Sequence, residues 1–168
     1  MIIVKTNIKA LFFFLSLTTL CAISPQAKSR EMFRRLGLGF TDQSATDLTS
    51  LSIKMQTSKY FSFGGVFGID TSDNGGQMAG IKVYQNLITE PHLTFYASTL
   101  LAYLNQKTSN ASQSGFQTDI TLGSEFSIPK LESIGFSFEF GVSIINLDDL
   151  TFKTTGNNII SSAIHFYL

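Results

Sequence analysis

The chain has few cysteines, few charged residues and no tryptophan. One cysteine occurs among 168 residues, and charged side chains make up 14%, against about 25% in typical soluble domains. Cys21 lies in the apolar N-terminal stretch, so the remainder of the chain cannot form a disulfide with itself. The formal net charge is zero, and without a basic surplus nucleic acid is not expected as a partner.

The N-terminus has the pattern of a secretory signal peptide. Lys5 and Lys9 precede an apolar stretch at 10–23, and small residues follow it. The stretch is shorter than the roughly 20 residues that a transmembrane helix needs. We therefore expect residues 1–29 to be a signal peptide, cleaved within 24–29, and residues 30–168 to form one exported domain.

Apolar and polar side chains alternate over residues 115–145. The apolar face carries Phe116, Thr118, Ile120, Leu122, Ser124, Phe126 and Ile128 on one strand, and Ile134, Phe136, Phe138, Phe140, Val142 and Ile144 on the next. Each strand is about ten residues or longer, which suits a tilted crossing of a bilayer. The other face is rich in Gly and Ser and carries carboxylates, which suits the narrow inside of a small barrel. We predict that the apolar face contacts lipid.

The same two-residue rhythm predicts eight strands in all. They are expected at 32–40, 48–56, 60–69, 78–87, 93–104, 116–128, 134–144 and 159–168. Short turns alternate with more polar connections, of which 106–114 and 146–158 are predicted to be long loops. Because lipid cannot satisfy the backbone groups of an edge strand, such a sheet must close. The predicted fold is all-β, an eight-stranded antiparallel up-and-down transmembrane β-barrel.

These features resemble the small eight-stranded outer-membrane barrels of the outer membrane protein A membrane-domain and opacity-protein type. The resemblance rests on the signal peptide, the strand rhythm over 32–168, and a last strand that ends in Ile164, Phe166 and Leu168. In that family the last residue is most often Phe. The resemblance implies a monomer in the outer membrane of a Gram-negative bacterium. It also implies contact with membrane lipids and lipopolysaccharide, and assembly by machinery that recognises these three terminal residues.

Charged residues on the polar faces would lie inside such a barrel. They are Arg35, Lys54, Lys82, Asp119, Glu125 and Glu139, with His165 on the inward face of the last strand. Buried charges are costly unless they are paired. We therefore predict an interior ion-pair network that closes the lumen, with a narrow polar channel as the alternative.

The sequence predicts no catalysis, metal site or cofactor. Ser161 and His165 are four residues apart on one strand, roughly 13 Å, which is too far for a hydrogen bond. The loop aspartates do not follow a calcium-binding pattern. Aromatic residues near the strand ends are expected to form girdles at the membrane surfaces. These are Tyr60, Phe61, Phe95, Tyr96, Tyr103, Phe116, Phe126 and Tyr167.

Three functions fit this pattern. The first is an integral outer-membrane barrel with a plugged interior and a structural or surface-interaction role through extracellular loops. The second is an exported soluble barrel that binds an apolar ligand as lipocalins do, with the phenylalanine-rich face turned inward. The third is a small-solute pore.

Overall fold

A computed structural model of the chain describes residues 35–45, 48–108, 111–155 and 159–168. The predicted signal peptide lies outside the described residues. The described elements are strands, and none of these residues forms a helix long and apolar enough to cross a membrane. The strands are β1 (Leu36–Thr41), β2 (Ser50–Gln56), β3 (Phe61–Ile69), β4 (Gly76–Glu90), β5 (Leu93–Thr108), β6 (Ala111–Ile128), β7 (Leu131–Asn146), β8 (Leu150–Thr154) and β9 (Ser161–Tyr167).

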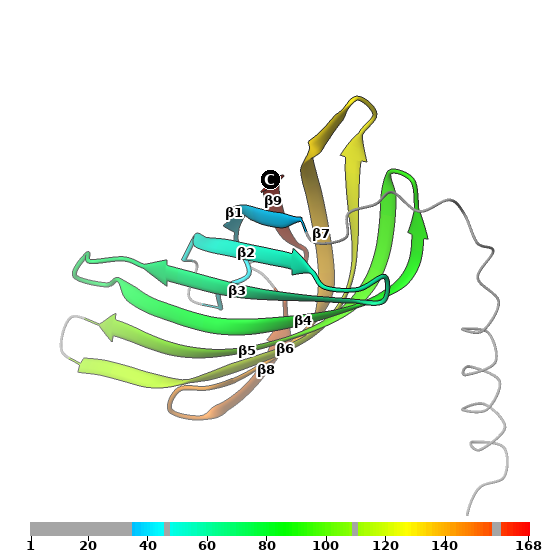
Figure 1. Ribbon diagram of the computed structural model, residues 1–168. Coiled ribbons are helices and arrows are strands. Elements are labelled where there is room, and N and C mark those ends of the chain that lie inside the picture. The colour runs from blue at the N-terminus through cyan, green and yellow to red at the C-terminus, as the bar shows by residue number, and fades with distance from the viewer. Residues whose placement is uncertain (1–34, 46–47, 109–110, 156–158) are drawn as a thin grey trace, which may run out of the picture.

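The strands form a closed antiparallel barrel (Figure 1). Each of β1 to β7 pairs with its neighbour in sequence, and β9 closes the barrel by pairing with both β1 and β7. The eighth position is shared by two strands. Along β7, residues 134–139 pair with β9 and residues 142–146 pair with β8. The predicted eight-position up-and-down barrel is confirmed, with its last strand broken in two.

The predictions of long loops at 106–114 and 146–158 are wrong in part. β5 and β6 continue as a paired ladder up to the rung between Thr108 and Ala111, and β8 occupies 150–154. The segment 106–114 is polar on both faces, so it shows no apolar alternation, yet its described backbone still pairs. β8 does alternate, with Leu150 and Phe152 against Thr151 and Lys153, but it has only five residues. The strands β4 to β7 are 15–18 residues long, whereas β1 to β3 have 6–9. The barrel wall is therefore taller on the side formed by β4 to β7.

The two faces of the sheet point as predicted. On β7, Phe138 and Phe140 are 46% and 56% exposed, while Glu139 between them is 5% exposed. The same alternation occurs on β2, where Ile53 is exposed and Lys54 is buried. Because neighbouring side chains of a strand point to opposite faces, an outward phenylalanine or isoleucine places the charged residue beside it inward. The outside of the barrel is apolar and the inside holds the charges.

In the connection between β1 and β2, the described residues 43–45 and 48 fold into the barrel. Gln43 and Ser44 are buried, and the half-buried Ala45 and Leu48 pack against an apolar cluster on the inner wall. That cluster consists of Val66, Met78, Leu100, Ala102, Leu104 and Ile145. It lies toward the end where β3 meets β4, which we call the loop end; the opposite end, at the turns 57–60, 91–92 and 129–130, is the short-turn end. The interior is therefore charged in its middle and apolar toward the loop end.

Candidate functional site

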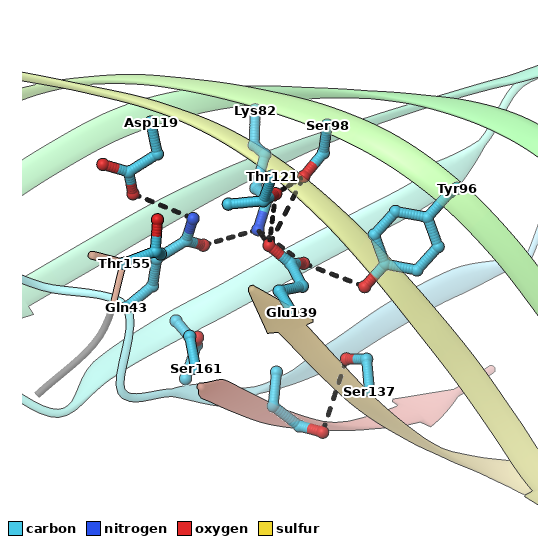
Figure 2. A network of polar contacts seen from close by, with 12 residues as sticks. Gln43, Lys82, Tyr96, Ser98, Asp119, Thr121, Ser137, Glu139, Thr155 and Ser161 are labelled. Carbon is cyan, nitrogen blue, oxygen red and sulfur yellow. Dashed lines mark hydrogen bonds and ion pairs between the residues drawn. The ribbon is translucent and has the colours of Figure 1, made fainter. Parts of the chain in front are cut away.

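Two lysine–glutamate ion pairs are buried inside the barrel. Glu139 belongs to the pair with the larger hydrogen-bond network and accepts most of its bonds (Figure 2). Lys82 Nζ of β4 donates to both carboxylate oxygens, at 2.7 and 2.6 Å. The Tyr96 hydroxyl of β5 donates to Oε1 at 2.8 Å, and the Thr121 hydroxyl of β6 to Oε2 at 2.9 Å. Lys82 and Glu139 are 4% and 5% exposed. The carboxylate thus joins four neighbouring strands through charge-assisted hydrogen bonds, which are the stronger kind.

Lys54 and Glu125 form the second pair. Lys54 Nζ of β2 lies 2.9 Å from Glu125 Oε2 of β6, so this pair crosses the lumen. The Tyr167 hydroxyl of β9 donates to the same carboxylate at 2.8 Å. The ammonium group also lies 4.4 Å from the centre of the Tyr84 ring, close enough for a cation–π contact. Each of the two glutamate carboxylates is therefore held by one lysine and one tyrosine.

Asp119 is buried but forms no ion pair within the described part of the chain. Its carboxylate accepts hydrogen bonds at 2.9 Å from the amides of Gln43 and Gln117. The Gln43 oxygen accepts in turn from Lys82 Nζ at 2.5 Å (Figure 2). Gln43 belongs to the inward-folded connection, so this amide ties that connection to both the Lys82–Glu139 pair and Asp119. Through Gln43, this connection extends the polar network toward the apolar cluster.

His165 is within hydrogen-bond distance of a serine that the sequence did not identify as its partner. Its Nε2 lies 2.9 Å from Ser52 Oγ of β2. Both residues pair with Gly39 of the intervening β1, and the missing side chain of Gly39 lets them meet over that strand. The Nδ1 atom of His165 is buried without a hydrogen-bond partner in the described structure, so no carboxylate orients the ring. A serine–histidine pair is present, but it lacks the third group of a hydrolytic triad.

A glycine also lies beneath the Glu139 site. Gly123 of β6 pairs with Tyr96 on one side and with Glu139 on the other. A Cβ atom at Gly123 would lie 2.7 Å from Glu139 Cγ and 2.8 Å from the Tyr96 ring. The two side chains therefore lean toward each other over the strand between them. The alternation of Gly with charged residues on the predicted polar faces has this physical cause: the small residue gives the large neighbours room to pair.

The remaining predicted residues lie outside this network. Arg35 precedes β1, is half-buried, and makes no ion pair with any residue of the described ranges. Phe166 of β9 and Leu168, which follows this strand, are 47% and 79% exposed, and Ile164 of β9 is half-buried. No group of three or more His, Cys, Asp or Glu residues that could hold a metal ion is found among the described residues.

Two tyrosines predicted to lie in the girdles are inside the barrel. Tyr96 and Tyr167 are 1% and 6% exposed, and they donate hydrogen bonds to the carboxylates of Glu139 and Glu125. The position of Tyr167, two residues after the inward-facing His165, was a usable signal for its orientation. Tyr96 was harder to place because its strand is apolar on both faces. Gln43 gave no signal, because the residues around it have no strand periodicity.

A tyrosine-to-phenylalanine exchange tests the Lys54–Glu125 pair. In Tyr167→Phe the Glu125 carboxylate loses its hydroxyl donor while the ring is kept. We expect the free energy of unfolding to fall by about 1.5–3 kcal/mol, the range for hydrogen bonds to charged groups. Urea unfolding followed by circular dichroism measures this change. Tyr103→Phe, at an exposed position on β5, is the matched control, and equal losses in both variants would contradict the assigned role.

The chain is similar to a known protein in structure, while its sequence matches none. No protein-family model and no curated protein sequence matches the chain. Among solved structures, the N-terminal β-barrel domain of OprF from Pseudomonas aeruginosa superposes with a TM-score of 0.62 at 14% sequence identity. The match covers 81% of this chain and 98% of that domain. The likeness is one of fold, and the chain thus has the closed eight-position fold of the small outer-membrane barrels, as the sequence resemblance implied.

Proposed function

We propose that the protein is an integral outer-membrane barrel with a closed interior and a structural role in the cell envelope. The observation that carries this proposal is the inverted burial of the sheet. Large apolar side chains such as Phe140 and Ile120 are 56% and 60% exposed, while Lys54, Lys82 and Glu139 are at most 6% exposed. A transmembrane barrel needs this arrangement, because its outside contacts hydrocarbon and its inside is polar.

The two alternatives fit the geometry less well. A soluble barrel with an apolar ligand inside would turn the phenylalanine-rich face inward, which is opposite to the observed orientation. A small-solute pore would need an open lumen. Here Lys54 and Glu125 meet across it, and Gln43 lies inside it, bonded to Asp119 and Lys82. Eight strands leave an interior that side chains can just fill.

The partners follow from this location. We propose contact with outer-membrane lipids and lipopolysaccharide, with the short-turn end in the periplasm. The assembly machinery would recognise Ile164, Phe166 and Leu168 on the outer face of the last strand. The outer connections at 70–75 and 147–149 are short, so a surface-binding role would use the tall wall of β5 and β6 rather than long loops. We propose a monomer without enzymatic activity.

A charge placed on the outer face tests the membrane location. Phe140 lies near the middle of the apolar band of β7, so Phe140→Arg is expected to destabilise the barrel by about 2–4 kcal/mol in lipid vesicles. In a soluble barrel the same change would have little effect. Unfolding in urea after reconstitution measures the difference. Cell fractionation, with the mobility shift of unboiled protein on gels, tests the location directly.

Asn146→Arg is the matched control. Asn146 lies on the same face of the same strand, six residues toward the loop end, where a charge reaches water. We expect a loss of at most about 1 kcal/mol there. Recovery of the protein from the soluble periplasm, or equal effects at the two positions, would exclude the membrane proposal.

A further inference from the structure

The outer face of the barrel has a groove across β3 and β4. The groove is shallow and open along the outside of the barrel, with a volume of about 680 Å³. It lies in the half of the barrel nearer the loop end. Its walls are apolar, with Ile53, Phe67, Ile81, Leu101, Tyr103 and Phe116 among the lining residues.

Two small residues form the floor of this groove. Ala79 of β4 pairs with Phe67 on one side and with Tyr103 on the other. One rung further from the loop end, Gly65 of β3 lies between isoleucines of β2 and β4. A Cβ atom at Gly65 would meet only the carbonyl oxygen of Gly80, at 3.5 Å, so the space above it is open. The two gaps are diagonal neighbours and together make one continuous channel on the surface.

The end of the groove nearer the loop end of the barrel is polar and basic. Beyond Ala79 and Tyr103 the next outward-facing rung is the pair Gln77 and Asn105. Lys107 is exposed on the same face of β5, four residues beyond Tyr103, or roughly 13 Å along the strand. Tyr103 and Phe116 pack edge to face at 5.8 Å between the apolar and the polar part. Aromatic residues of this kind are enriched at the level of lipid headgroups.

We propose that this groove binds one acyl chain of a phosphorylated outer-leaflet lipid of the lipopolysaccharide type, with its phosphate at Lys107. The proposal rests on the membrane orientation given above. The apolar walls match the chain, and the ammonium and amide groups match an anionic phosphate in charge and in hydrogen bonding. A flexible lysine stem reaches the headgroup level while its methylene groups cover the apolar surface. A second apolar hollow on the outer face, between Leu87, Phe95 and Phe138, has a volume of about 390 Å³. The groove over Gly65 and Ala79 is the larger of these two, and it leads toward Lys107.

Native mass spectrometry of the detergent-solubilised protein with diphosphoryl lipid A tests the site. We expect one retained lipid per unmodified protein. Gly65→Leu and Ala79→Leu fill the two gaps and are expected to lower its occupancy at least fivefold. Lys107→Gln is expected to remove the preference for diphosphoryl over monophosphoryl lipid A while the acyl chain still binds. Phosphatidylglycerol at the same concentration tests the lipid class, and equal retention would overturn the assignment to a lipopolysaccharide-type lipid.

Ala97→Leu is the control for the filled gaps, because Ala97 is a small residue of β5 that does not line the groove. Lys130→Gln, in the turn at the short-turn end, is the control for charge. Unchanged occupancy in both gap-filling variants, or an equal loss in Ala97→Leu, would overturn the site. These outcomes are distinct from failure of the membrane proposal, in which the unmodified protein would be soluble without detergent.

Discussion

Replacing Glu139 with alanine is expected to lower the free energy of unfolding by about 3–5 kcal/mol, the range for breaking a buried ion pair from one side. The change leaves the Lys82 ammonium, 4% exposed, without its carboxylate. It also removes the acceptor of the Tyr96 and Thr121 hydroxyls. Because the chain has no tryptophan, unfolding in lipid vesicles is followed by circular dichroism and by the mobility of unboiled protein.

Two further variants separate the buried charge from other causes. Glu132→Ala removes an exposed carboxylate from the same strand and is expected to have a small effect. The double variant Lys82→Met, Glu139→Leu removes both charges and is expected to regain most of the loss, since apolar residues can replace a buried pair. A loss of under about 1 kcal/mol in Glu139→Ala would show that this pair does not support the fold.

The same variant is not expected to open a wide pore. The Gln43 segment is also held by Gln117 and by Asp119, so it stays inside when Glu139 is lost. Its half-buried Leu48 remains packed on the apolar cluster. Planar-bilayer recordings of the unmodified protein and of Glu139→Ala should therefore show no stable large conductance. A stable wide pore in the unmodified protein would refute the closed interior.

The central hairpin could be predicted from sequence because its period is unambiguous. On β7 every second residue is large and apolar from Ile134 to Ile144, and a slip of one residue would put every one of them on the wrong face. The same alternation also predicts that Lys54, Lys82 and Glu139 face inward, without knowledge of how the barrel closes. The alternation of side chains is a property of a single strand. It therefore predicts which residues face inward even when the neighbouring strands are not known.

The partners of these charges could not be predicted in the same way. Whether Lys54 meets Glu125 or Glu139 depends on the stagger between strands that are far apart in sequence, and that stagger is set by how the whole barrel closes. The meeting of Ser52 and His165 over Gly39 has the same origin.

The strands at the loop end could not be predicted from sequence for a different reason. Residues outside the membrane can be polar on both faces of a strand, so the ends of β5 and β6 carry no periodic signal. β8 alternates Leu150 and Phe152 with polar residues, but its five residues are too few to mark a strand within a polar stretch. Gln43 illustrates the limit most clearly. It lies in a polar connection whose composition is typical of a solvent-exposed loop, yet it is 1% exposed.

Adding a methyl group at Gly123 tests whether the interior is built on glycine. The new Cβ of Gly123→Ala would lie 2.7 Å from Glu139 Cγ and 2.8 Å from the Tyr96 ring, so both side chains must move. They are joined by a 2.8 Å hydrogen bond that this movement would break. We expect a loss of about 1–3 kcal/mol in the free energy of unfolding, as for other overpacked interiors.

Gly65→Ala is the matched exchange on the outer face. It adds the same methyl group to a neighbouring part of the sheet, where the nearest atom lies at 3.5 Å. Because alanine loses less backbone freedom than glycine on folding, this variant is expected to be neutral or to gain up to about 1 kcal/mol. The difference between the two variants isolates the crowding at Glu139 from the change in backbone entropy. Equal effects at the two positions would mean that the charged side chains adapt to an added methyl group, and that the glycine between them is not what allows them to pair.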